Sequence, residues 1–107
     1  MTTLDPAAGY VILINTFTVE PDKAEDLLAE LSRATEDSMR PMAGFVSASL
    51  HISQDKRHVA NYAQWCSQED LDAMMADTGT QAHMRRAADL ATSFEPIYYE
   101  LRETLPA

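Results

Sequence analysis

The chain has 107 residues, of which 46% are apolar, and this length and composition fit one globular domain. Its 17 acidic and 8 basic residues give a net charge of −9, which argues against nucleic acid and anionic membranes as partners. The longest apolar run, 10–14, is far shorter than the roughly 20 residues of a membrane span. One cysteine, Cys66, excludes an intrachain disulfide, and the lack of a signal-peptide pattern predicts a cytoplasmic location.

Alternation and helical spacing divide the chain into strands and helices. Residues 1–8 are expected to be a disordered lead, and residues 9–105 a single domain. A first strand is predicted over 9–19, because it is rich in Tyr, Val, Ile, Phe and Thr. A helix then runs from Glu20-Pro21-Asp22 to about Met39, with Asp26, Glu30 and Arg33 on its solvent side.

Two further strands, 45–54 and 57–66, are predicted to form a hairpin. A two-residue loop would pair Leu50 with Asn61, whereas a three-residue loop would pair His51 with Asn61. We favour Leu50, because Val46, Ala48, Leu50 and Ile52 form the more apolar side of the strand.

The remaining chain predicts two helical pieces and a last strand. Ser67 is expected to cap a helix, Thr78-Gly79-Thr80 to interrupt it, and a second piece to cover 81–91. The last strand is expected over 94–103, with Pro96 favouring an edge position.

The resulting order, βαββαβ, predicts an α+β fold of the ferredoxin-like type. Its antiparallel sheet would have both helices on one face. The other face would present Ile12, Ile14 and Tyr62 to water, which is a large apolar area. Packing against the same face of a second copy would cover it, so we expect a homodimer.

Polar side chains in apolar strands indicate a small-molecule pocket. Alternation places Val59, Asn61, Ala63 and Trp65 on one face, so a carboxamide and an indole N–H point the same way. Asn15 lies in an even more apolar strand. The alternatives are a structural amide at Asn15 or Asn61 and an ordinary core tryptophan at Trp65.

The segment Asn61-Tyr62-Ala63-Gln64-Trp65, followed by Ser67-Gln68-Glu69-Asp70, resembles the antibiotic biosynthesis monooxygenase family. Residues 42–47 resemble that family's turn into its second strand, and the likeness covers about 9–103. The resemblance implies a dimeric ferredoxin-like α/β barrel. It also implies a cofactor-independent oxygenase that converts an anthrone-type ring to a quinone.

By position, the resemblance implies that Asn15, Asn61 and Trp65 are catalytic. It also implies that Arg85 is a pocket arginine. Leu50 and Leu71 stand where one relative has tyrosines, so a proton path through phenols at these positions is absent. His83, Leu50 and Met74 complete the expected substrate-binding residues. Met39, Met42, Met74, Met75 and Met84 are gap fillers that would also suit a malleable wall around a planar polycycle.

Such chemistry needs an aromatic substrate that itself reduces O2, and neither cofactor nor metal is expected. The three histidines lack the spacing of a metal site, and the three glycines form no nucleotide-binding pattern. His83, on the expected inward stripe of the last helix, is the candidate base; alternatively no strong base is needed.

Two other functions fit the sequence. The same fold serves haem-degrading monooxygenases, which resemble this chain at Asn15, Trp65 and His83. A non-catalytic dimer that binds a small molecule is the third possibility.

Overall fold

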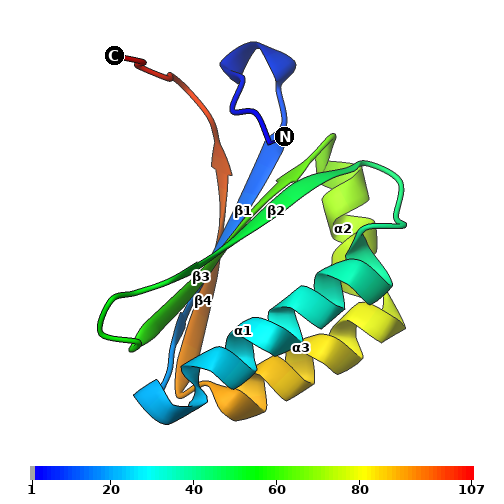
Figure 1. Ribbon diagram of the computed structural model, residues 1–107. Coiled ribbons are helices and arrows are strands. Elements are labelled where there is room, and N and C mark those ends of the chain that lie inside the picture. The colour runs from blue at the N-terminus through cyan, green and yellow to red at the C-terminus, as the bar shows by residue number, and fades with distance from the viewer. Residues whose placement is uncertain (1) are drawn as a thin grey trace.

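The structure, a computed structural model, describes residues 2–107. A four-stranded antiparallel sheet has its α-helices on one face (Figure 1). The strands are β1 (Val11–Thr18), β2 (Phe45–Ile52), β3 (His58–Trp65) and β4 (Ser93–Glu100), in the order β2-β3-β1-β4. The predicted α+β, ferredoxin-like fold is therefore confirmed.

The helices are η1 (Pro6–Ala8), η2 (Pro21–Lys23), α1 (Ala24–Ala34), η3 (Thr35–Met39), α2 (Gln68–Ala76) and α3 (Thr78–Leu90). The π-helix η3 continues α1 to Met39, where the spacing predicted its end. The expected disordered lead contains the 3-10 turn η1, in which the Asp5 carboxylate accepts the Ala7 N–H at 2.9 Å; Met1 lies outside the described residues. None of the helices within 2–107 is long and apolar enough to cross a membrane.

The β2–β3 hairpin has the register that the apolar pattern favoured. Leu50 is opposite Asn61, and His51 is opposite Ala60. Strand β2 ends at Ile52 and strand β3 begins at His58, so both strands are shorter at the hairpin than predicted. The residues between them, 53–57, form a turn in which Lys56 has a φ of 60°. The side chain of Ser53 accepts the N–H groups of Arg57 and His58, which holds this turn together.

Side-chain caps define the start of both later helices. Ser67 caps α2 as predicted, accepting the Asp70 N–H at 3.1 Å. However, α3 begins at Thr78 instead of Gln81, because the Asp77 carboxylate accepts both the N–H and the hydroxyl of Thr80. Gly44, with a φ of 84°, lets α2 approach the sheet: a Cβ there would lie 2.0 Å from the Asp70 carboxylate.

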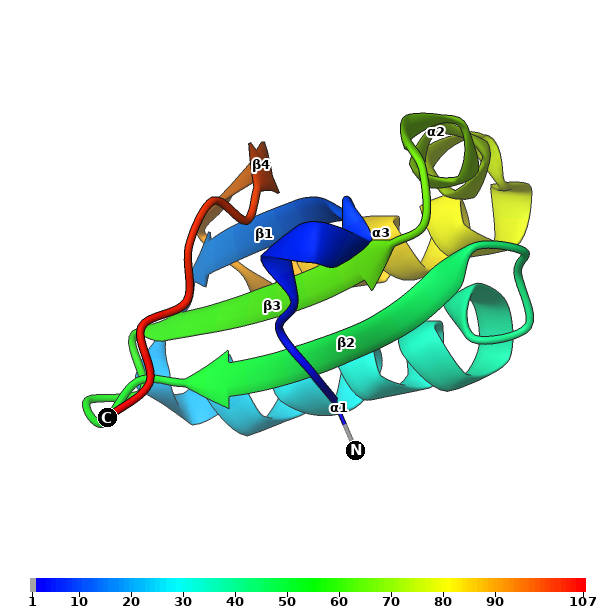
Figure 2. The same ribbon diagram turned by 90° about the horizontal axis from the view of Figure 1, so that it is seen from above.

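The packing of the helices leaves one part of the sheet open to a pocket. Helix α1 packs over β2 and β3, α2 packs over β3, and α3 packs chiefly on α1. Figure 2 shows β4 at the opposite edge of the sheet from β2. Strand β4 pairs only with β1 and is exposed along its whole length, so Pro96 occupies the expected edge strand.

Candidate functional site

A pocket of about 130 Å³ lies between the helices and the inner face of β1, β3 and β4. The strands contribute Leu13, Asn15, Phe17, Asn61, Ala63, Phe94 and Pro96. The helical segments contribute Leu31, Met39, Met74, Met75 and Met84. A larger, open depression of about 670 Å³ runs along β2 and residues 2–3, but none of its lining residues has a buried side-chain atom without a partner.

Two asparagines face each other across the floor of this pocket. Asn15 on β1 is directly opposite Asn61 on β3, and their exposed fractions are 8% and 6%. The Oδ1 atom of each is buried without a hydrogen-bond partner. Buried polar atoms in native proteins are nearly always satisfied, so two unsatisfied acceptors side by side in a pocket indicate a ligand that donates hydrogen bonds to them. This pair is the strongest functional feature of the described chain.

The lining contains no titratable side chain. Its only polar side chains are the two carboxamides, which act as donors and acceptors without ionising. The pocket therefore offers a dry, neutral environment with hydrogen-bonding groups from two adjacent strands.

Trp65 lies on the same face as Asn61 but not on the pocket wall. Its side chain is fully buried and packs edge-to-face on Phe45, with ring centroids 5.4 Å apart. A register irregularity between Phe45 and Ser47 allows Phe45 to lie opposite Trp65. The indole Nε1 has no partner, as the prediction of a donor requires, although Ala63 separates Trp65 from Asn61 along the strand.

Of the expected substrate-binding residues, only one lines the pocket. Met74 lines the pocket. Leu50, although opposite Asn61, packs with the cluster around Phe17 and Val59 and is not part of the lining. Arg85 is exposed and also lies outside the lining, since it is on the side of α3 that faces solvent.

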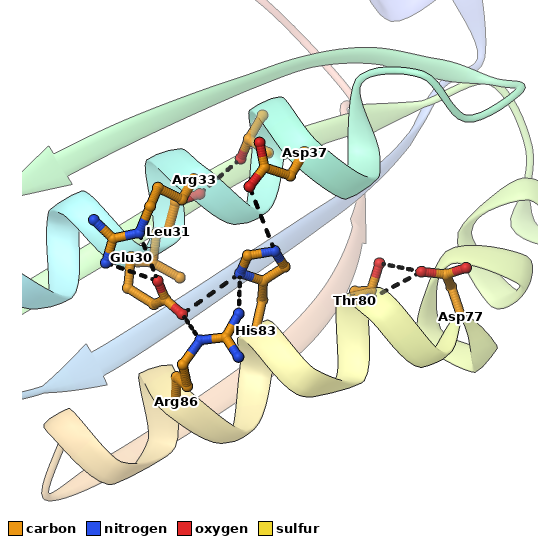
Figure 3. Close-up of polar contacts among 9 residues, drawn as sticks. Glu30, Leu31, Arg33, Asp37, Asp77, Thr80, His83 and Arg86 are labelled. Atoms are coloured by element: carbon orange, nitrogen blue, oxygen red, sulfur yellow. Dashed lines mark hydrogen bonds and ion pairs between the residues drawn. The ribbon is translucent and has the colours of Figure 1, made fainter.

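His83 does not reach the pocket, contrary to the expectation that it lies on the inward stripe of the last helix. It is buried toward α1, where its Nδ1 is 2.9 Å from the Arg86 guanidinium and 3.5 Å from Glu30 (Figure 3). Its Nε2 is 3.9 Å from Asp37. Helix α3 packs chiefly on α1, so part of its buried face, including His83, is directed toward α1. The next residue, Met84, is the one that lines the pocket.

Glu30 anchors this second polar group, although its position in the helix predicted exposure to solvent. It is 2% exposed and accepts hydrogen bonds from Arg86 at 2.5 Å and Arg33 at 3.0 Å. Burial raises the pKa of its carboxyl, but the hydrogen bonds from Arg86, Arg33 and His83 together outweigh burial and hold the pKa below its ordinary value. We call Glu30, His83 and Arg86, with Arg33 and Asp37, the α1–α3 cluster.

The placement of these residues disfavours a haem site. Asn15 lines the pocket, Trp65 is enclosed in the core, and His83 is engaged in the α1–α3 cluster. The three residues that resemble a haem-degrading enzyme therefore do not share one cavity. Within residues 2–107, no group of three or more His, Cys, Asp or Glu side chains is arranged to hold a metal ion.

Several pocket residues were not singled out by the sequence. Phe17, Phe94 and Pro96 come from β1 and β4, and the strand pairing alone brings them beside Asn15 and Asn61. The register of β1 with β4, which places Pro96 opposite Asn15, had no marker in the sequence.

Known proteins resemble this chain in sequence. The family model "Antibiotic biosynthesis monooxygenase" matches residues 10–89. The chain is 39% identical over 107 residues to tetracenomycin-F1 monooxygenase of Streptomyces glaucescens, covering 100% of this chain and 95% of that protein.

Solved structures show the same fold. A monooxygenase from the gene ActVA-Orf6 of Streptomyces coelicolor, in complex with nanaomycin D, aligns with a TM-score of 0.81 at 26% identity over 96% of each chain. SnoaB, a cofactor-independent oxygenase from Streptomyces nogalater, aligns with a TM-score of 0.77 at 24% identity over 92% of this chain and 99% of its own.

Proposed function

Because this chain belongs to the antibiotic biosynthesis monooxygenase family, we propose that it is a cofactor-independent monooxygenase that oxidises a polycyclic, anthrone-type phenol to a quinone with O2. The observation that supports this most directly is the unpartnered pair Asn15 and Asn61 in an apolar pocket. The relatives support the substrate class, since one is named as a monooxygenase of tetracenomycin F1 and another was solved in complex with nanaomycin D.

The proposed reaction needs a substrate that supplies its own electrons. Loss of a proton from the central CH2 of an anthrone gives a carbanion whose charge is delocalised onto the carbonyl oxygen. This anion transfers an electron to O2, and recombination with protonation gives a hydroperoxide at the same carbon. Loss of water from the hydroperoxide leaves the second carbonyl of the quinone.

The two carboxamides would stabilise the oxyanion that forms in the first step. The unpartnered Oδ1 atoms would accept hydrogen bonds from phenol hydroxyls of the substrate and orient it. The N–H groups of the same carboxamides would donate to the oxyanion inside an apolar enclosure, where a preorganised donor contributes roughly 3 kcal/mol to the transition state. No lining side chain can act as a base. We therefore propose that stabilisation of the oxyanion makes the substrate acidic enough to release its proton to water at the mouth of the pocket, without His83.

The size of the pocket supports a binding mode in which only one ring of the substrate is enclosed. A cavity of 150 Å³ holds about one benzene ring, so a pocket of about 130 Å³ encloses one ring of the substrate. The other rings would extend between Met75 and Phe94, which line the pocket and are 40% and 52% exposed. Unbranched methionine side chains on the helical wall can shift to enlarge the space.

The test is oxidation of anthrone under air by the purified protein, followed by quinone absorbance and O2 consumption. Asn61→Ala and Asn15→Ala should lower kcat, whereas Ser49→Ala, on the opposite face of the sheet, should not. Trp65→Phe should lower kcat less than either, because Trp65 does not line the pocket. Unchanged kcat in both asparagine variants would exclude this site.

The alternative of a non-catalytic binding module predicts binding without O2 consumption in the same assay. A haem-degrading enzyme predicts a Soret band on addition of hemin and bleaching when a reductant follows. We expect neither of the two results.

We also propose that the protein is a homodimer formed through the sheet face away from the helices. Tyr62, Ile14 and Ile97 form a continuous apolar row across β3, β1 and β4 on this face. The expectation that Ile12 is exposed on the same face is wrong: it is only 2% exposed, because the N-terminal segment lies over it. Ile97→Lys should give a monomer by light scattering, and Ser32→Lys, on the exposed side of α1, should not. The single domain over 9–105 and the cytoplasmic location remain predictions.

A further inference from the structure

Methionine is concentrated around the proposed oxygenase pocket. Four of the six methionines in the chain, Met39, Met74, Met75 and Met84, line its helical side. A thioether is the side chain most readily oxidised to a sulfoxide by a peroxide, apart from a thiol. The lining contains no cysteine, so these sulfur atoms are the reducing groups nearest to any oxidant formed inside.

Burial separates these methionines into two kinds. Met39 and Met74 are only 3% and 2% exposed, so oxidants in solution have little access to them. Met75, at the mouth, is 40% exposed. Met42 is partly buried against the same hydrophobic cluster as Met39 and Met74, but it is not part of the lining. It therefore provides an internal control for oxidation from solution.

We propose that Met39 and Met74 are an oxidation site for the benzylic hydroperoxide that forms in the pocket; this inference rests on the proposed function. The distal oxygen of the hydroperoxide is transferred to the thioether, the O–O bond breaks and an S–O bond forms. Sulfur loses two electrons and the peroxide gains them. The proton of the distal oxygen moves to the oxygen bound to carbon, so the organic product is the alcohol.

This transfer competes with the loss of water that gives the quinone. A hydroperoxide that persists in the pocket is reduced by the methionine wall, and the enzyme is modified instead of releasing a reactive peroxide. A sulfoxide places a polar oxygen against Leu13, Leu31 and Ala63, so the modified pocket binds an aromatic ring less tightly. Methionine sulfoxide reductase reverses the change.

The first experiment uses the resting protein and does not depend on turnover. Samples are treated with cumene hydroperoxide, a benzylic hydroperoxide with one ring, or with hydrogen peroxide, and sulfoxides are located by peptide mass spectrometry. We expect the ratio of oxidation at Met39 and Met74 to oxidation at Met42 to be several-fold higher with cumene hydroperoxide. Equal ratios with the two oxidants would overturn the proposal.

The second experiment follows the same peptides during oxidation of anthrone under air. Sulfoxide at Met39 and Met74 should accumulate with quinone in the wild type, and in Asn61→Leu both should form more slowly, in proportion to its lower kcat. Quinone without sulfoxide at these two positions overturns this proposal and leaves the proposed function intact. Absence of quinone contradicts the proposed function, and with it the substrate as the source of the peroxide.

A variant connects the modification to activity. The double substitution Met39→Leu with Met74→Leu keeps the volume of the wall and removes both sulfur atoms. Because both residues line the pocket, the initial rate of the variant is measured first, and we expect the total number of turnovers before inactivation, divided by that rate, to rise several-fold. Met42→Leu is the matched control. An unchanged total number of turnovers would show that oxidation at this site does not limit the enzyme.

Discussion

The pocket and the α1–α3 cluster are built from neighbouring residues of the same two helices. Leu31 and Met84 line the pocket, while Glu30 and His83, which precede them in the chain, belong to the cluster. In the cluster, polar side chains form hydrogen bonds and ion pairs with one another at 2.5–3.9 Å. In the pocket, two neutral amides have oxygens without partners.

This difference separates polar groups that hold the fold from polar groups that await a ligand. Removing one member of a satisfied buried group leaves the others unpaired, which lowers stability. Removing a buried group that has no partner leaves nothing unpaired, so stability is kept or improved while function is lost. The two regions should therefore respond in opposite ways to substitution.

The largest effect is expected at the pocket asparagines. Asn61→Leu should lower kcat about 10²–10³-fold, the usual result of losing one donor to a developing oxyanion. Its free energy of unfolding should be equal to or higher than that of the wild type, because an unsatisfied carboxamide is replaced by an apolar group of similar size. Steady-state kinetics and urea denaturation measure the two quantities.

Asn15→Leu should behave in the same way, as its amide is opposite Asn61 and equally unpartnered. A large loss of stability in either variant would mean that the carboxamide has a structural partner, and the contrast between the two regions would fail.

An intermediate effect is expected in the α1–α3 cluster. Glu30→Gln should reduce the free energy of unfolding by about 1.5 kcal/mol near neutral pH, the lower end for hydrogen bonds to charged groups, because Arg33 and Arg86 are partly in solvent. The kcat should change little, since Glu30 does not line the pocket.

The contribution of Glu30 to the free energy of unfolding should depend on pH. The pKa of Glu30 is lowered from 4.5, so its contribution is fully present above pH 4.5 and is lost as the pH falls through the folded-state pKa. The difference between wild type and Glu30→Gln in urea denaturation should therefore shrink on acidification below pH 4.5. A difference that is constant down to pH 3 would contradict the assigned ion pairs.

The smallest effect is expected at Arg85, which the family resemblance placed in the pocket. Arg85→Gln should change the free energy of unfolding by no more than about 0.5 kcal/mol, as for other exposed positions. Its kcat/KM for anthrone should equal that of the wild type. A clear rise in KM would show that Arg85 contacts the part of the substrate outside the pocket.

Local patterns predicted much of the fold, because they report on forces that act between neighbours in the chain. The apolar side of β2 gave the correct pairing of Leu50 with Asn61, since one face of that strand had to be buried. The Ser67 cap was predicted because its partner, Asp70, is three residues away. The start of α3 was wrong because Asp77 was not recognised as a cap.

The sequence by itself determined that Asn15 and Asn61 lie in apolar strands, on the face that packs against the helices, because alternation along a strand fixes which side each residue faces. The tertiary structure decided which buried polar residues are satisfied. It placed His83 against Glu30 rather than beside the asparagines, since α3 packs on α1, and it left the two carboxamides in a pocket without ionisable groups. Helical periodicity identifies a buried face but not the element that covers it, and only the packing of α3 supplies that information.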